Sequence, residues 1–89
     1  KRIAYVSYDN GSPDIFVISP DGRGNKRLTD TPLRDENPCW TNDGNYIVFS
    51  SNRNTSAGWE IYIMRTEGQL QTPLTNYIAD DIYPIFIGQ

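Results

Sequence analysis

The apolar residues of this chain form short runs that are separated by polar, turn-forming segments. Runs 3–7 (Ile-Ala-Tyr-Val-Ser) and 47–51 (Ile-Val-Phe-Ser-Ser) are rich in β-branched and aromatic side chains, and runs 14–18 and 60–64 have the same character. Such runs are too short for stable helices but have the usual length of strands. The pattern therefore predicts four central β-strands.

Turn signals and weaker runs complete the predicted strands. Two weaker runs, 26–29 and 72–75, are predicted to be outer strands, and Pro73 is acceptable there only at a sheet edge. A fourth strand is expected around Cys39-Trp40, with a counterpart at 85–87. Three pairs accept the positive φ of tight turns: Asn10-Gly11, Asp21-Gly22 and Asp43-Gly44.

The two halves of the chain are copies of one pattern. An offset of 46 residues carries run 14–18 onto 60–64, whereas upstream an offset of 44 carries 3–7 onto 47–51. The two extra residues lie in the polar segment 52–58, as expected for a loop that varies on a fixed scaffold. Further pairs at 46 are Asp21-Gly22 with Glu67-Gly68, Leu28-Thr29 with Leu74-Thr75, Asp35 with Asp81, Pro38 with Pro84, and Trp40 with Phe86.

Four short strands in every 44 to 46 residues is the spacing of β-propeller blades. Blades occur in rings because a four-stranded sheet has two faces to cover, and a neighbouring sheet on each side covers them. We therefore predict an all-β chain with one propeller segment over residues 1–89. Repeat 1 covers about 1–44 and repeat 2 about 45–89, giving two four-stranded antiparallel blades of a larger or oligomeric propeller.

The predicted blades are out of phase with the chain ends. Run 3–7 corresponds to the second strand of a blade, and 83–87 is a spare first strand. We expect this spare strand to complete the first blade of a neighbouring copy, so that a homotrimer closes a six-bladed ring or a homotetramer an eight-bladed one. The alternative is that the sequence is a fragment of a longer propeller.

Residues 40–53 resemble the repeat signature of TolB-type β-propellers. In that signature Trp, Ser, Pro, Asp and Gly precede an apolar strand that ends in Ser and Arg, and here Thr41-Asn42 replace Ser-Pro. The segment 60–75 continues the signature in order, whereas 86–89 lacks its Asp-Gly turn. The resemblance implies a ring of six to eight blades.

The resemblance also implies a choice of functions. TolB-type propellers dock other envelope proteins in the periplasm, and related propellers filter substrates in prolyl-oligopeptidase-like and tricorn-like serine peptidases. We therefore expect a non-catalytic scaffold that binds protein or peptide partners in a periplasmic or extracellular compartment. The alternatives are a substrate-filtering segment of such a peptidase and a two-blade self-assembling module with no ligand.

Composition weighs against several other functions. The chain has no histidine, which removes the usual general base and the commonest metal ligand, so we expect no enzyme activity, cofactor or metal. With 11 acidic and 8 basic residues it lacks the dense basic surface that nucleic acid requires. It also lacks the apolar run of about 18 residues that a membrane span needs.

Two chemical groups are expected to be structural. Cys39 has no histidine to activate it and lies beside Trp40, so we expect a buried, inert thiol. Asp35 and Asp81 hold equivalent positions ahead of a proline, where an aspartate commonly accepts hydrogen bonds from turn amides. We favour that function for them over calcium binding.

Loop residues are the candidates for partner binding. Trp59 ends the inserted loop and has no aromatic counterpart in the first repeat, and Arg53 lies close to it in sequence. An exposed tryptophan with a nearby arginine is typical of a binding hot spot, although the indole could instead fold back over a blade edge. The predicted binding residues are Trp59, Arg53 and Tyr77.

Overall fold

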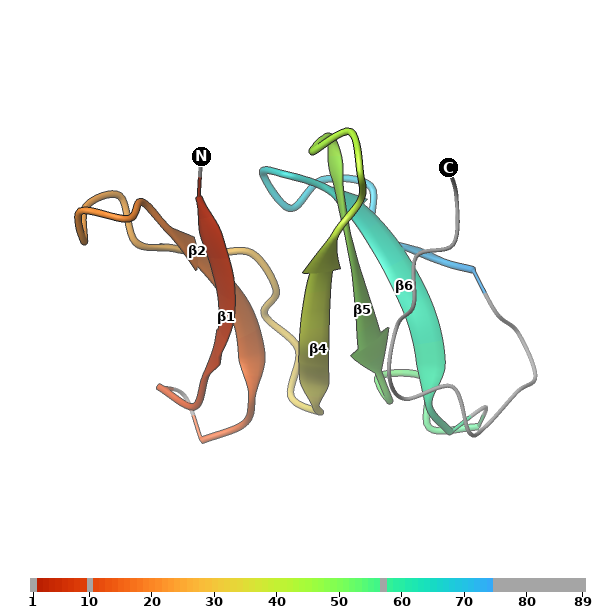
Figure 1. Ribbon diagram of the computed structural model, residues 1–89. Helices are drawn as coiled ribbons and strands as arrows, with labels where there is room; N and C mark the ends of the chain where they lie inside the picture. Colours follow the sequence, from red (N-terminus) through yellow and green to blue (C-terminus); the bar gives the residue numbers. More distant parts are fainter. Residues whose placement is uncertain (1, 10, 57, 75–89) are drawn as a thin grey trace.

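The protein folds into two antiparallel β-sheets (Figure 1). The computed structural model describes residues 2–9, 11–56 and 58–74. The first sheet has the strand order β1-β2-β3 and the second the order β4-β5-β6-β7. The strands are β1 (Ile3–Ser7), β2 (Asp14–Ile18), β3 (Lys26–Arg27), β4 (Asp35–Trp40), β5 (Tyr46–Ser51), β6 (Glu60–Arg65) and β7 (Thr72–Pro73).

The predicted strands are confirmed within the described residues. β1, β2, β5 and β6 cover the four central runs, and β4 contains Cys39-Trp40. The outer strands β3 and β7 are shorter than expected, at two residues each. The Leu28 and Leu74 amides still donate to the Ile15 and Ile61 carbonyls of the neighbouring strands, but regular strand pairing ends before these residues. Run 83–87 lies outside the described residues, and the first sheet has three strands in the part of the chain that is described.

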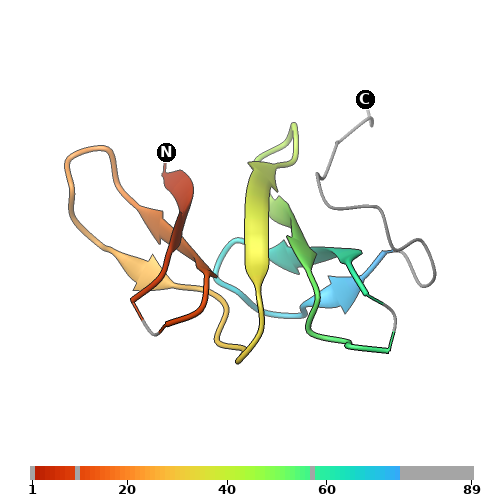
Figure 2. The ribbon, with the colours of Figure 1, turned by 90° about the horizontal axis from the view of Figure 1, so that it is seen from below.

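The core lies between the two sheets. Ile15, Val17 and Leu28 of the first sheet pack against residues of β5 and β6. β4 lies where the two sheets meet, with β1 and β2 on one side and β5 on the other, as Figure 2 shows. The second sheet contributes Ile47, Phe49, Tyr62 and Met64, and Ala4, Val6 and Trp40 pack at the margin of this cluster.

The first sheet carries an aromatic pair on the face that points away from this core. Phe16 follows Ile15 in β2, and successive strand residues point to opposite faces of a sheet. Its ring therefore lies on the other side of the first sheet, where its centroid is 5.6 Å from that of Tyr5. In the second sheet Phe49 and Tyr62 form the equivalent pair at 5.7 Å, and these rings face the first sheet.

The sheets are also joined by hydrogen bonds to main-chain carbonyls. The Asp35 amide donates to the Pro13 carbonyl at 3.0 Å, and the Gln71 side-chain amide donates to the Leu28 carbonyl at 2.9 Å. Gly68 approaches so closely that a β-carbon there would lie 2.9 Å from the Leu28 carbonyl oxygen. The described part of the chain has no helix with the length and apolar character needed to cross a membrane.

Candidate functional site

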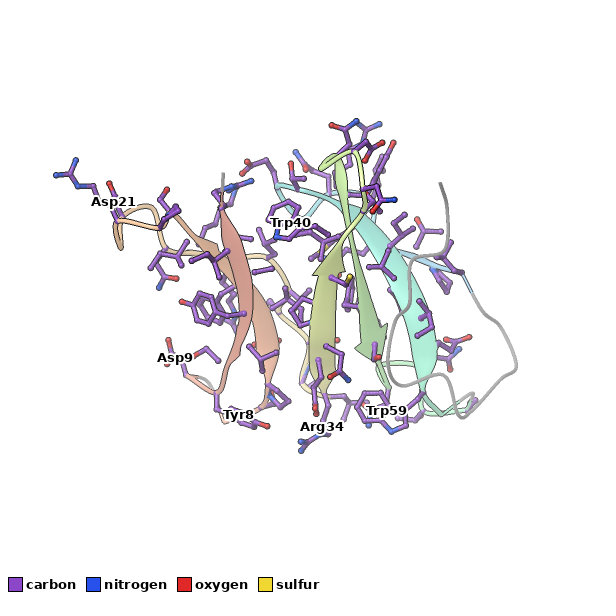
Figure 3. All side chains as sticks on the ribbon, in the orientation of Figure 1. Tyr8, Asp9, Asp21, Arg34, Trp40 and Trp59 are labelled. Carbon is purple, nitrogen blue, oxygen red and sulfur yellow. The ribbon has the colours of Figure 1, made fainter. Side chains whose placement is uncertain are left out.

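The strands place their connecting loops at two ends of the molecule. The β1–β2 loop, the β3–β4 connection and the β5–β6 loop meet at the lower end in Figure 1. Figure 3 places the side chains of Tyr8, Arg34 and Trp59 at this end, one from each of the three connections. We call this surface the Trp59 end and define it by these three residues.

Arg34 is the most connected residue of the Trp59 end. Its Nε donates to Glu36 Oε2 at 2.6 Å, and its guanidinium donates to the Tyr8 hydroxyl at 3.4 Å. The Glu36 hydrogen bond is the main reason that the pKa of Arg34 is raised above its ordinary value. The Arg34 side chain is 49% exposed and Tyr8 is 56% exposed, so both can contact a partner.

Main-chain bonds fix the position of Arg34. Its amide donates to Asn52 Oδ1 at 2.8 Å, and the Asn52 amide donates to the Arg34 carbonyl at 3.1 Å. This reciprocal pair fastens the β3–β4 connection to the start of the β5–β6 loop. The charge at the Trp59 end is therefore held on a defined backbone.

Trp59 lies at the end of the β5–β6 loop, directly before β6. Its side chain is half-buried, which is intermediate between the exposed anchor and the folded-back ring considered from the sequence. A partly covered indole keeps its orientation while leaving some of its surface open. Its function in binding stays a prediction.

Arg53 lies in the same loop but takes part in an internal network. Its guanidinium is 4.4 Å from the centroid of Tyr62 and 3.3 Å from Asp35 Oδ1. The Arg53 Nε also donates to Ser51 Oγ at 3.0 Å, and the side chain is only 20% exposed. The structure thus places Arg53 beneath the loop as a support, where it holds the segment that leads to Trp59. Tyr77, the third predicted residue, lies outside the described residues.

Sequence reasoning missed Tyr8 and Arg34. Both lie next to strand ends, and both differ from their repeat equivalents, which are Asn52 and Asp80. This departure from the repeat was the signal available in the sequence. It did not reveal that the reciprocal Arg34–Asn52 bonds join two loops, because those bonds form only after the sheet has folded.

Asp35 and Cys39, which were expected to be structural, differ from the expectation in their hydrogen-bond donors and in their burial. Asp35 is fully buried and accepts hydrogen bonds from the Ser51 and Thr31 hydroxyls at 2.6 and 2.8 Å, rather than from turn amides. Cys39 is half-buried, because only one side of β4 faces the core, and its thiol donates to the Trp40 carbonyl at 3.6 Å. Among the described residues, no three metal-ligating side chains come together.

The opposite end of the molecule carries a cleft of about 420 Å³. It is lined by Arg2, Trp40, Gly44 and Thr66, so it lies over the junction of the two sheets. The Arg2 guanidinium donates to the Thr66 carbonyl at 3.1 Å and to Glu67 Oε2 at 3.0 Å. Lys26 Nζ also donates to Glu67 at 2.7 Å and, with Arg2, lowers the pKa of this carboxyl. The charges of this cleft thus serve mainly to join the sheets.

Comparisons with curated proteins find TolB proteins. The chain is 34% identical over 94 aligned positions to the Tol-Pal system protein TolB of Francisella tularensis subsp. mediasiatica, which covers 96% of the chain and 21% of that protein. It is 39% identical over 62 residues to the protein of the same name from Geobacter sulfurreducens, covering 70% of the chain and 14% of that protein. No protein-family model matches the chain.

A peptidase and a solved structure are also similar. Dipeptidyl-peptidase 5 of Porphyromonas gingivalis is 35% identical over 51 residues, covering 57% of the chain and 8% of the peptidase. A structure assigned to TolB from Agrobacterium tumefaciens superposes with a TM-score of 0.75 at 27% identity, covering 84% of the chain and 26% of that protein. The chain thus spans about a fifth or less of the length of the curated relatives.

Proposed function

Because the chain belongs to the TolB-type β-propeller repeat family, we propose that it is a segment of a non-catalytic propeller that binds a protein or peptide partner. The observation that supports this most directly is the Trp59 end, where Tyr8, Arg34 and Trp59 lie on three different connections of one edge. Tryptophan, tyrosine and arginine are the residues most enriched in binding hot spots. A rigid sheet beneath them lowers the entropic cost of binding.

The chemistry of the Trp59 end indicates the kind of peptide that would bind. Arg34 retains N–H groups that can meet a carboxylate, and its partner Glu36 keeps it in a fixed orientation. The rings of Tyr8 and Trp59 offer flat apolar surface on either side of this charge. We therefore propose a partner segment that carries an acidic residue next to aliphatic or aromatic side chains.

The test is a selection from a displayed library of random 12-residue peptides on the intact chain. Enriched peptides are synthesised, labelled and titrated by fluorescence anisotropy. We expect Arg34→Ala and Trp59→Ala each to weaken binding by about 1–3 kcal/mol, or roughly 5- to 150-fold. Asp21→Ala is the matched control, because Figure 3 places Asp21 at the opposite end of the first sheet, and it should leave affinity unchanged.

Two results would contradict the proposal. One is a library without enriched peptides at micromolar concentrations of the chain. The other is a set of peptides that bind Trp59→Ala and Arg34→Ala as tightly as the unaltered chain. Such peptides would bind a surface other than the Trp59 end. Circular dichroism of each variant establishes that its fold is intact before affinities are compared.

We propose a periplasmic location, because the resemblance to TolB-type propellers implies that compartment and the chain is similar to TolB proteins. The similarity to dipeptidyl-peptidase 5 supports a second candidate, in which these blades belong to the substrate-filtering propeller of a serine peptidase. The parent gene distinguishes the two. A hydrolase domain encoded downstream in the same reading frame would favour the peptidase, and an export signal without such a domain would favour the scaffold.

We also propose that the blades lie in a closed ring, which three copies of the chain would complete as six blades and four copies as eight. The support is the three-stranded first sheet, which has one strand fewer than the second in the described part of the chain. Sedimentation equilibrium of the 89-residue chain tests this proposal, because a ring assembled from copies of it has three or four times its mass of 10.2 kDa. A folded monomer would contradict it.

A further inference from the structure

Arg65 is the unpaired cation among the described residues. It ends β6, where it is exposed, and it forms no ion pair with a described carboxylate. Every other lysine or arginine in the described part of the chain lies between 2.6 and 3.8 Å from a carboxylate oxygen; these residues are Arg2, Arg23, Lys26, Arg27, Arg34 and Arg53. The N–H groups of the Arg65 guanidinium are therefore available to a partner.

The β6–β7 turn places Leu70 beside Arg65. This turn is the repeat equivalent of the β2–β3 turn, and each closes with a hydrogen bond of 2.9 Å from the amide of its first residue to the carbonyl of its fifth. In the β2–β3 turn, a β-carbon added at Gly24 would lie 3.8 Å from Ser19 Oγ. The offset of 46 carries Gly24 onto Leu70 and Ser19 onto Arg65, so the two side chains of the second repeat start next to each other.

Leu70 has a backbone conformation that suits glycine. Its φ is 56°, and the φ of its equivalent Gly24 is 68°. The left-handed conformation costs a leucine free energy, because its β-carbon crowds the following carbonyl, whereas glycine has no β-carbon. Leu70 is 67% exposed, so burial does not offset this cost. A strained and exposed apolar side chain is better explained by a contact with another molecule than by the stability of the fold.

The first sheet shows that a neighbouring blade leaves this turn exposed. The second sheet packs against the first, yet residues 20–25 are all exposed. These residues correspond to 66–71 at the offset of 46. The second sheet already has the first sheet on one side, so a further blade on its other side should leave the surface around Leu70 accessible.

A pocket of about 370 Å³ adjoins Arg65 at the upper end in Figure 1, where the β4–β5 and β6–β7 turns lie. Its one carboxylate, Glu67, already accepts hydrogen bonds from Arg2 and Lys26. The carboxylate of Asp43, in the β4–β5 turn, accepts hydrogen bonds within that turn. The positive charge of Arg65 is therefore not compensated in the pocket, which is lined by Asn45, Tyr46, Arg65, Thr66, Glu67 and Gln69.

We propose that Arg65 and Leu70 form a second docking surface, for a partner protein that presents a carboxylate beside an aliphatic side chain. The carboxylate pairs with the Arg65 guanidinium, and the aliphatic group covers Leu70. An apolar contact next to the charge fits a protein segment better than a free anion. Main-chain hydrogen bonds fix the turn that carries both residues, which lowers the entropic cost of binding. The surface lies opposite the Trp59 end, so a partner bound here leaves the Trp59 end free.

The test uses labelled peptides that are selected on the intact chain from a library of random 12-residue peptides and titrated by fluorescence anisotropy. We expect a class with an acidic residue next to an aliphatic one, which binds Arg65→Gln and Leu70→Gly each at least about five-fold more weakly. These peptides should bind Trp59→Ala as tightly as the unaltered chain. Arg23→Gln is the matched control and should leave affinity unchanged, because Arg23 is an 88% exposed arginine in the equivalent turn of the first sheet.

Leu70→Gly also separates binding from stability. It introduces the residue of the first repeat and removes the left-handed strain, so the melting temperature should not fall by more than about 4 °C. A larger fall would show that the leucine supports the fold and would contradict the proposal. Peptides sensitive to Trp59→Ala alone would support the Trp59 end and overturn this surface. Peptides that depend on Arg65 but bind Leu70→Gly unchanged would also overturn it, because they would reveal a site for anions alone.

Discussion

Gly22 and Gly68 allow the contact between the blades to be measured by two equivalent substitutions. They are repeat equivalents, and their φ angles are nearly the same, at 87° and 91°. Each amide closes the same type of turn, from Gly22 to the Ser19 carbonyl at 2.9 Å and from Gly68 to the Arg65 carbonyl at 2.8 Å. They differ in their surroundings, because a β-carbon at Gly22 meets no atom within 4 Å and one at Gly68 lies 2.9 Å from the Leu28 carbonyl oxygen.

The expected costs follow from these surroundings. An alanine at either position must adopt a left-handed backbone conformation, which costs about 1–2 kcal/mol. Alanine also restricts the unfolded chain, which returns roughly 0.4–1 kcal/mol in both variants. Both terms cancel in the comparison. The remaining difference is the overlap with a main-chain atom that cannot rotate away, so Gly68→Ala should lose about 1–3 kcal/mol more free energy of unfolding than Gly22→Ala.

Urea unfolding followed by tryptophan fluorescence gives both free energies, at matched chain concentrations. A difference of this size should also separate the melting temperatures by about 4–8 °C per kcal/mol for a chain of this length. Equal losses in the two variants, within about 0.5 kcal/mol, would refute the reasoning. The two sheets would then not be packed as closely at Gly68 as the structure places them.

Two further predictions concern charged groups. Asp35→Asn should lower the free energy of unfolding by about 2–4 kcal/mol in urea titrations, because the buried carboxylate is the acceptor for Ser51, Thr31 and Arg53; a loss below about 0.5 kcal/mol would contradict this. The pKa of Glu67 is lowered by its hydrogen bond to Lys26 and by Arg2, so its contribution to stability is complete above its ordinary value of 4.5 and is lost as the pH falls below it. Glu67→Gln should therefore reduce the loss of stability below about pH 4.5 in a curve of unfolding free energy against pH. An unaltered curve would show that the contacts of Glu67 with Lys26 and Arg2 do not contribute to stability.

The repeat made most of the fold predictable. Two copies of one pattern at fixed offsets indicated which runs are strands, because β-branched and aromatic content and turn residues act locally. The lengths of β3 and β7 were not predictable in the same way. Edge strands end where the next ladder bond would fail, and that depends on tertiary position rather than on propensity.

The candidate site was predictable only in part. Trp59 could be identified because it breaks the repeat, and the structure places it at the loop end with Tyr8 and Arg34. Arg53 appeared equally suitable in the sequence, but the aspartate that holds it, Asp35, is 18 residues away along the chain. Charge partners so distant in sequence cannot be paired from the sequence alone, so an internal arginine and a surface arginine look alike.

The hydrogen bonds between the sheets have a consequence for how such proteins change over generations. Pro13, Leu28 and Thr66 all accept through their main-chain carbonyls, which every residue type possesses. These three hydrogen bonds between the sheets therefore do not depend on which side chains stand at the acceptor positions. A duplicated blade could therefore form these three hydrogen bonds with its neighbour whatever side chains it carries at the accepting positions, while the apolar core and Gly68 remain the parts of the contact that depend on residue type.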